Sequence, residues 1–452
     1  MKRLSLATVS LIALLAAPAL AQQSAPVIDQ NSVAAHIGFL AGEELQGRGS
    51  ATRDEAIAAA YVAAQFRLAG LTSVPAMDGY LQRAPVIKTT PSGVATLTVG
   101  GVAVSQGDDL AILSGATRAA AGAAVVAEGS DAAAMPTGEV VLIAPPEGAG
   151  FRALVGAAAQ KGARLIVLRR TEALAALAAG GGQARTAIRL ADAPERGGAV
   201  IVVVSPDAFD RMAAAGGAAE FAPGEPTVEQ GVTTNAIGWL QGTDPDAGVL
   251  MISAHLDHIG VRPDGVVMYG ANDDASGTVA VIELANALAA SGPHERSIMF
   301  VAYGAEEAGL LGSRYFVDHP PIPLEEIAAN LEIEMIGDQD PQLPAGVMMM
   351  TGFERSNFGA ALKERGALIG PDPYPEQNFF QRSDNYALAL KGIVAHTISG
   401  WATIPTYHTA EDTIENLNIP FMTNAIQSLV EPLKAMADGA FTPEWAEGGR
   451  PE

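Results

Sequence analysis

The sequence predicts an α/β protein: a mainly parallel mixed sheet sandwiched by helices, with a smaller inserted β-rich domain. From Thr234 onward, short apolar runs alternate with helical patterns, which is typical of a parallel sheet covered by helices. Residues 93–228 differ, because they are rich in Ala and Gly and contain only short β-like runs. The chain has 452 residues, 49% of them hydrophobic, so it can form more than one core.

Residues 1–21 have the pattern of a secretory signal peptide. Met1-Lys2-Arg3 is basic, residues 4–15 are apolar, and Ala19-Leu20-Ala21 offers a cleavage site after about Ala21. An N-terminal membrane anchor is the alternative, but the apolar run is short. No later run is long enough to span a membrane. We therefore expect a periplasmic or secreted protein with no membrane span after cleavage.

The charge balance excludes one large class of partners. The chain carries 27 Lys+Arg against 50 Asp+Glu, a net charge of −23, and loss of Lys2 and Arg3 with the signal takes it to −25. Such a surface repels phosphate backbones, so we expect no nucleic-acid binding. The chain has no cysteine, which excludes disulfides and thiol catalysis.

The first part of the main domain, residues 26–92, is predicted to be helical at its start. Residues 32–71 carry apolar positions at helical spacing, interrupted by a polar turn at residues 47–50. Within them, residues 56–66 form the clearer helix, because they are rich in alanine and contain no proline.

The inserted domain, residues 93–228, is predicted from three apolar runs. Residues 140–144, 165–168 and 199–204 have strand character, and residues 153–161 are a helix candidate between the first two. The Gly/Ala bias would also suit a disordered linker, but the repeated hydrophobic runs favour a folded module.

The catalytic part, residues 229–442, is predicted from strands and one clear helix. The helix covers residues 275–290 and stops at Gly292-Pro293. The strands are residues 249–254, 297–302, 330–336 and 392–397. The tail, residues 443–452, is rich in Pro, Glu and Gly, and we expect it to be flexible.

Imidazole and carboxylate groups follow these strands at or just beyond their ends. They are His255-Leu256-Asp257-His258, Asn272-Asp273-Asp274, Glu306-Glu307, Glu334 and the downstream Tyr407-His408. Open α/β sheets bind ligands at the carboxyl ends of their strands. Nitrogen and oxygen ligands without thiolates suit a catalytic zinc site with open positions.

Each of these residues also has an ordinary structural interpretation. A single histidine at a strand end, such as His255, is most often a core residue with its hydrogen bonds satisfied. Glu306 and Glu307 would equally stabilise the positive end of a following helix. The number of acidic and imidazole groups in register favours the metal site over these readings.

Taken in order, these motifs resemble the M28 zinc peptidases. Residues 40–48, Leu-Ala-Gly-Glu-Glu-Leu-Gln-Gly-Arg, are similar to the opening pattern of that family, and five motifs follow in the family's order. The resemblance covers essentially the whole mature chain and implies a zinc-exopeptidase type of fold. Residues 138–168 are similar to the protease-associated (PA) domain that many members insert before the catalytic core.

The resemblance implies two Zn²⁺ ions per subunit. His255 and Glu334 would bind the first, Glu307 and His408 the second, and Asp273 would bridge both. Glu306 would be the general base that takes a proton from metal-bound water. Asp257 lies two residues after His255 on the same strand face, where it can accept the other imidazole N–H and orient the ring.

Some positions depart from the family or carry less weight. Glu334 stands where the family commonly has aspartate, with Glu332 as a weaker substitute, and Asn385 stands where a histidine is common. We expect His258 to be structural, His396 to be packed in a strand, and His36, His294 and His319 to lie on the surface. Tyr407 would either line the pocket or donate to a reaction intermediate, or simply pack.

The sequence thus predicts an exported dinuclear zinc aminopeptidase whose substrates are peptides with a free N-terminus. The alternatives are a glutamate carboxypeptidase-like relative, a glutaminyl cyclase-like relative, which typically needs one zinc, and a non-catalytic binding protein on the same fold. Side-chain preference and oligomeric state are not predicted.

Overall fold

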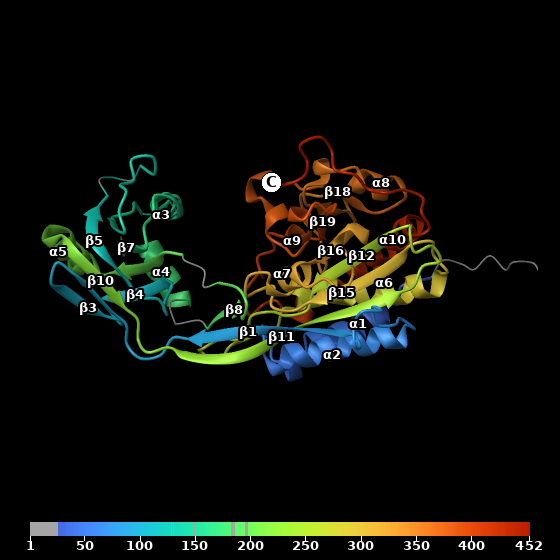
Figure 1. The fold of residues 1–452 in the computed structure, drawn as a ribbon, viewed down its shortest axis with the longest axis horizontal. Coiled ribbons are helices and arrows are strands. Elements are labelled where there is room, and N and C mark those ends of the chain that lie inside the picture. Colours follow the sequence, from blue (N-terminus) through green and yellow to red (C-terminus); the bar gives the residue numbers. More distant parts are fainter. Residues whose placement is uncertain (1–25, 128, 130, 148–149, 182–185, 195–197) are drawn as a thin grey trace, which may run out of the picture.

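The computed structural model describes residues 26–127, 129, 131–147, 150–181, 186–194 and 198–452. The proposed signal segment, residues 1–21, lies outside the described residues. The chain forms two lobes, each built on one sheet, and the long strands β1 (Leu81–Thr90) and β11 (Thr227–Leu240) run from one to the other (Figure 1). We call them the main lobe and the insert lobe.

The main lobe contains a nine-stranded sheet in the order β18-β17-β19-β16-β12-β15-β11-β1-β8. Its centre is four parallel strands, β19 (Ala395–Ser399), β16 (Ile327–Glu334), β12 (Val249–His255) and β15 (Ser297–Tyr303). Antiparallel pairs flank this centre, made with β17 (Met348–Met350) and β11, and then with β1 and β8 (Ala187–Leu190). The strand β18 (Ile369–Pro371) pairs in parallel with β17. The predicted fold class is confirmed.

Helices cover both faces of this sheet because its central strands are apolar on both sides. Leu250 and Ile252 of β12 pack in one core with α1 (Gln30–Leu40), α2 (Arg53–Leu68), α6 (Gly277–Ser291) and α10 (Ile419–Ala437). Val249 and Met251 pack on the other face with α7 (Leu311–Asp318) and α9 (Asn385–Leu390). Alternation of period two along a buried strand explains this division. The short α8 (Phe358–Glu364) belongs to the first core.

The insert lobe contains an eight-stranded mixed sheet in the order β3-β2-β10-β5-β6-β7-β9-β4. Its strands are β2 (Thr96–Val99), β3 (Val102–Ser105), β4 (Leu110–Ser114), β5 (Ala120–Val126), β6 (Val140–Ile143), β7 (Leu165–Arg169), β9 (Val200–Val204) and β10 (Gly217–Ala222). Its helices are α3 (Phe151–Gln160), α4 (Glu172–Gly181) and α5 (Pro206–Ala215). The three predicted strands and the predicted helix are all present. A linker is therefore excluded for the described part of this segment.

The insert is not self-contained. Strand β8 leaves it and pairs antiparallel with β1 at the edge of the main sheet, with Lys88 opposite Ile188. This connection was not predicted, because residues 187–190 are short and contain an arginine, so they lack the continuous apolar run of a buried strand. The edge of the main sheet is therefore formed by a segment of the insert.

The C-terminal tail also differs from expectation, because it packs against the main lobe. The Trp445 indole donates a hydrogen bond to the Gly392 carbonyl at 2.9 Å, and its ring lies 5.4 Å from that of His396. The Ala446 N–H donates to the Arg355 carbonyl at 2.8 Å. One half-buried aromatic anchor outweighs the Pro, Glu and Gly composition that suggested flexibility.

A search of the described residues finds no helix with the length and apolar character needed to cross a membrane.

Candidate metal centre

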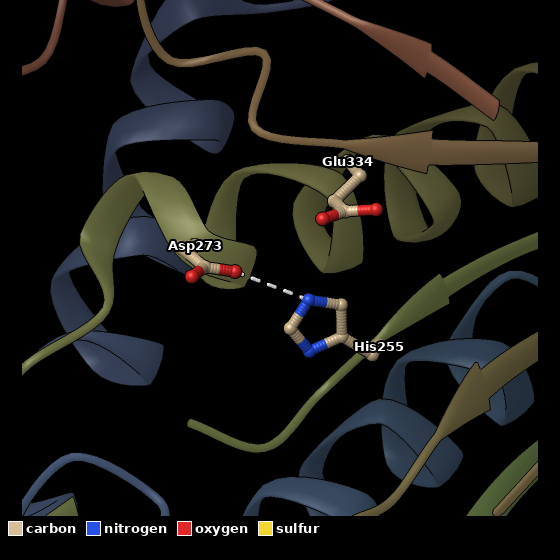
Figure 2. Close-up of side chains that lie close together, drawn as sticks. All are labelled: His255, Asp273 and Glu334. Carbon is tan, nitrogen blue, oxygen red and sulfur yellow. Dashed lines mark ion pairs between the residues drawn. The ribbon is translucent and has the colours of Figure 1, made fainter. Parts of the chain in front are cut away.

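Two strand ends and one turn bring one group of ligating side chains together. His255 is the last residue of β12, Glu334 the last of β16, and Asp273 lies in the turn at residues 271–276 that leads into α6. Figure 2 shows these three side chains pointing toward one another from three different elements. The His255 Nε2 atom lies 3.2 Å from the Asp273 Oδ1 atom, and ligating atoms of all three lie within 4.8 Å of one another.

A second group shares Asp273 with the first. Ligating atoms of Asp273, Glu307 and His258 lie within 4.8 Å of one another. The His408 Nε2 atom is 3.1 Å from the Asp273 Oδ2 atom and 3.0 Å from the Glu307 Oε1 atom. All five predicted ligands therefore meet at one place, with Asp273 between the two groups.

His258 is the unexpected member. Its Nδ1 atom lies 2.9 Å from the Glu307 Oε1 atom, at the same carboxylate that His408 approaches. We expected this residue to be structural. The structure instead places it among the candidate ligands of the second group, which then contains one more histidine than the family pattern predicted.

The donor atoms fit a cation. His255 Nε2, His258 Nδ1, Asp273 Oδ2, Glu307 Oε1 and His408 Nε2 are buried, and none has a hydrogen-bond partner in the described part of the chain. Buried polar atoms are rarely left unpaired, because losing water without a replacement costs free energy. Imidazole and carboxylate donors at this spacing suit zinc, and two groups sharing one carboxylate suit a pair of ions.

The electrostatics of the cluster favour positive charge. Burial lowers the pKa of His408, but the carboxylates of Asp273 and Glu307 outweigh it and raise that pKa to about 10. Burial likewise opposes the charged form of His255, yet Asp257 and Asp273 hold its pKa well above the usual value. A cluster that holds protons this firmly also attracts metal cations, which compete for the same lone pairs.

Asp257 connects the first group to Glu306. Its Oδ1 atom accepts a hydrogen bond from the Glu306 N–H at 2.9 Å and lies 3.8 Å from the His255 Nδ1 atom. The Ser50 hydroxyl donates to the Asp257 Oδ2 atom at 2.6 Å. The His255 ring is closer to the Asp257 backbone carbonyl, at 3.2 Å, so both the carbonyl and the carboxylate of Asp257 face this ring.

Glu306 has a strongly shifted pKa. Burial raises the pKa of its carboxyl well above the usual value, His255 lowers it in part, and Glu307 raises it further. A carboxyl group with a raised pKa accepts and holds a proton more readily than an exposed one. The Glu306 side chain lines a small cavity of about 40 Å³ together with Asp273 and Glu334.

The rest of that cavity has a mixed lining, with Arg382 and several hydroxyl side chains beside apolar ones. Met335, Met349 and Phe379 contribute to its walls, and Tyr407 lines it as well. The Tyr407 ring stacks on the His408 ring with centroids 3.8 Å apart. Tyr407 is thus both a wall of the cavity and a packing partner of a candidate ligand.

Two positioning residues were missed by sequence reasoning. Arg48 is fully buried, and its guanidinium donates to the carbonyls of Leu256, Tyr269 and Gly270 at 2.8 Å each, so it joins the loops after β12 and before α6. Asp412 accepts from the backbone N–H of Asp273 at 3.1 Å. The sequence offered one signal for each residue. Arg48 is the last residue of the family-like pattern at residues 40–48, and Asp412 lies four residues after His408.

Several other predicted positions can now be placed. Glu332 accepts a hydrogen bond from Ser253 and is thereby withdrawn from the cluster. Asn385 accepts from Thr397 at 2.9 Å, so it packs inside the lobe. His396 is buried as expected. The surface prediction for His36 and His294 is wrong, because His36 contacts the Tyr61 hydroxyl at 2.9 Å and His294 contacts Asp438 at 2.7 Å, so both are satisfied within the fold.

A mixed sheet with ligating groups at the carboxyl ends of its parallel strands defines the zinc-exopeptidase class of fold. Residues 235–431 match the model of peptidase family M28. The chain therefore contains an M28 peptidase domain.

Curated relatives match over about two fifths of the chain. Aminopeptidase YwaD of Bacillus subtilis is 28% identical over 184 residues, covering 38% of this chain and 37% of the relative. Leupeptin-inactivating enzyme 1 of Streptomyces exfoliatus is 31% identical over 206 residues, covering 41% and 44%. The matched segments thus span less than half the length of these relatives.

Solved structures extend the likeness to nearly the whole chain. An aminopeptidase from Aneurinibacillus sp. strain AM-1 superposes with a TM-score of 0.61 at 20% identity, covering 91% of this chain and 94% of that one. A zinc aminopeptidase from Bacillus subtilis gives a TM-score of 0.56 at 18% identity, covering 95% and 98%. At these identities the likeness establishes the two-lobed fold.

Proposed function

We propose that this chain is an exported aminopeptidase that uses two zinc ions to hydrolyse the N-terminal residue from peptides. The observation that carries the proposal is Asp273, which belongs to both groups of ligating atoms. A single carboxylate with one oxygen toward each group is the arrangement that holds two cations close together. The M28 domain and the relatives named as aminopeptidases support the reaction class.

We assign His255 and Glu334 to the first zinc, Glu307 and His408 to the second, and Asp273 to both. His258 lies close enough to Glu307 to assist or replace His408. When bound, the ions would polarise the scissile carbonyl and lower the pKa of a water molecule. The Glu306 and Asp257 carboxylates, which are not assigned to either ion, would attract the free α-ammonium group of a peptide.

In this proposal the protein moves one proton. Glu306 accepts it from the attacking water and delivers it to the amine that leaves, and burial supplies the raised pKa that both transfers need. Asp257 holds the Glu306 backbone N–H at 2.9 Å and faces the His255 ring. Asp257 therefore positions the base and the first-site histidine together.

The N-terminal segment and the insert complete the proposal. Residues 1–21 would direct export to the periplasm or outside the cell and then be removed. The insert lobe has parallel and antiparallel strands and three helices, and we propose that it is a PA-like domain. Its contact with the main sheet through β8 supports a role beside the active site rather than a separate one.

Two activity assays separate this function from its alternatives. An aminopeptidase hydrolyses leucyl-glycine but not N-acetyl-leucyl-glycine, whereas a carboxypeptidase-like enzyme cleaves the blocked peptide at its C-terminal residue. A cyclase-like enzyme instead converts N-terminal glutaminyl peptides without hydrolysis. Efficient cleavage of the acetylated dipeptide, or cyclisation alone, would overturn the proposal.

Metal analysis tests the ligand assignment. We expect two zinc ions per chain, and one in Glu334→Ala, because the second group keeps Asp273, Glu307 and its histidines. Glu325→Ala removes an exposed acid just before β16 and should leave two ions bound. Two tightly bound ions and full activity in Glu334→Ala would show that another group holds the first metal.

A further inference from the structure

A second cavity opens onto the same metal cluster. It has a volume of about 570 Å³ and is lined by Glu307, by residues of the loop at 46–54, by strand β1, by Ile188 of β8, and by residues 259–263. The small cavity, of about 40 Å³, contacts Asp273, Glu306 and Glu334 instead. The cluster therefore borders a small cavity at Asp273, Glu306 and Glu334 and a wide cavity at Glu307.

A peptide bond held at the cluster requires space for both of its sides. The small cavity, of about 40 Å³, is large enough for one side chain at most, which suits the N-terminal residue. The wide cavity falls within the range of about 300–1,000 Å³ that is typical of small-molecule sites. It therefore suits the leaving part of a short peptide.

Lys88 gives the wide cavity a specific chemistry. Its side chain is half-buried on β1, and its Nζ atom donates to the Ala51 carbonyl at 2.9 Å. No ion pair of Lys88 is found among the described residues, although the chain carries 50 acidic side chains. An ammonium group has three donors, so two remain for a ligand. Arg262 lines the same cavity, but Asp264 pairs with it at 2.8 Å.

Lys88 is also close to the catalytic machinery. The Ala51 carbonyl that holds it follows Ser50, whose hydroxyl donates to Asp257 at 2.6 Å. Asp257 in turn holds the Glu306 N–H. Lys88 and Glu307 line the same cavity, so a ligand in it can contact both.

We propose that the wide cavity binds the leaving part of a short peptide, and that Lys88 pairs with the C-terminal carboxylate of that peptide. The inference rests on the proposed aminopeptidase function and adds its substrate class, dipeptides and tripeptides with a free carboxylate. Strand β8, which pairs with β1 beside Lys88, forms a wall of this cavity from the insert. The insert thereby limits how far a bound peptide can extend.

The test compares substrates that differ only in the terminal group. Leucyl-glycine and leucyl-glycinamide share one scissile bond, but only the first carries the carboxylate; leucyl-glycyl-glycine and its amide extend the pair by one residue. In Lys88→Met, we expect KM for the carboxylate form of the dipeptide or the tripeptide to rise about fivefold, the upper range for a solvent-accessible ion pair. KM for the amides and kcat for all four should stay unchanged.

Two further variants make the result specific. Lys88→Arg should retain the preference for the carboxylate, and Arg262→Met should leave it intact because Arg262 already has an acidic partner. If KM rises equally for the free acids and the amides, Lys88 acts only through the Ala51 loop. If KM changes for neither the dipeptide nor the tripeptide, Lys88 has no role in binding. Either result overturns the inference. A wild-type protein that hydrolyses none of the four peptides would instead refute the proposed function.

Discussion

The two lobes are both sheets packed against helices, yet they bury different kinds of side chain. Among the described residues 93–226 of the insert, the buried polar side chains amount to Thr171. The main lobe buries Arg48, Glu55 and Asp384 as well as the metal cluster. Burying an ionisable group costs several kcal/mol unless partners compensate it. The described part of the insert is thus packed almost entirely by apolar side chains, whereas the main sheet gathers its buried ionisable groups at its strand ends.

The largest expected effect is a loss of activity in the main lobe with no change in stability. Glu306→Gln should lower kcat by about 10²–10⁴-fold, the usual contribution of general acid–base transfer, while zinc content and Tm stay the same. The matched control is Glu220→Gln on the exposed face of β10 in the insert, which should change nothing. Wild-type turnover in Glu306→Gln, or loss of zinc, would show that this residue has another role.

The second prediction separates packing in the two lobes. Phe221 in the insert and Phe300 in β15 are both fully buried. Truncation of either to alanine should cost about 3–5 kcal/mol of unfolding free energy. Phe221→Ala should keep its zinc, because the cluster lies in the other lobe, whereas Phe300→Ala should bind zinc more weakly, because β15 leads into Glu306 and Glu307. Equal zinc loss in both variants would show that the lobes unfold as one unit.

The third prediction concerns acid. All seven histidines lie outside residues 93–228, and burial lowers the pKa of His396 from 6.5 to about 4. The unfolded chain therefore takes up a proton at a higher pH than the folded one, so stability present above pH 6.5 is lost as the pH falls toward 4. The loss should reach about 3 kcal/mol.

Tryptophan fluorescence can follow this loss, because all three tryptophans lie in the main lobe and Trp445 contacts His396. Denaturant curves at several pH values should show a flatter dependence for His396→Gln than for the wild type. An unchanged pH dependence in that variant would assign the acid sensitivity to other groups.

The same comparison explains what the sequence could and could not predict. The central strands were predictable because they are continuously apolar, and the ligands follow them directly, as His255 follows residues 249–254. Arg48 and Asp412 were not, because their role is to join loops that are more than a hundred residues apart in the chain. The proximity of His258 to Glu307 was not predictable, because it depends on how two loops meet.

The smallest expected effect concerns the two halves of the cluster. Glu334 belongs to a group of three candidate ligands, whereas Glu307 lies among four: itself, Asp273, His258 and His408. Aspartate at position 334 is one methylene group shorter, so its carboxylate would lie farther from the first metal, which has only three candidate ligands. The pairing of β16 with β19 limits how far the backbone can shift to restore the distance.

We therefore expect Glu334→Asp to keep two zinc ions at saturation but to hold the first about 10-fold more weakly, as happens when ligand geometry is disturbed through outer contacts. In Glu307→Asp the loss should be smaller, because two histidines approach the same carboxylate and can compensate. Competition with a chelator measures both affinities. The opposite result would be wild-type zinc affinity in Glu334→Asp and weaker binding in Glu307→Asp. The group with four candidate ligands would then be the one that is sensitive to side-chain length, which contradicts this prediction.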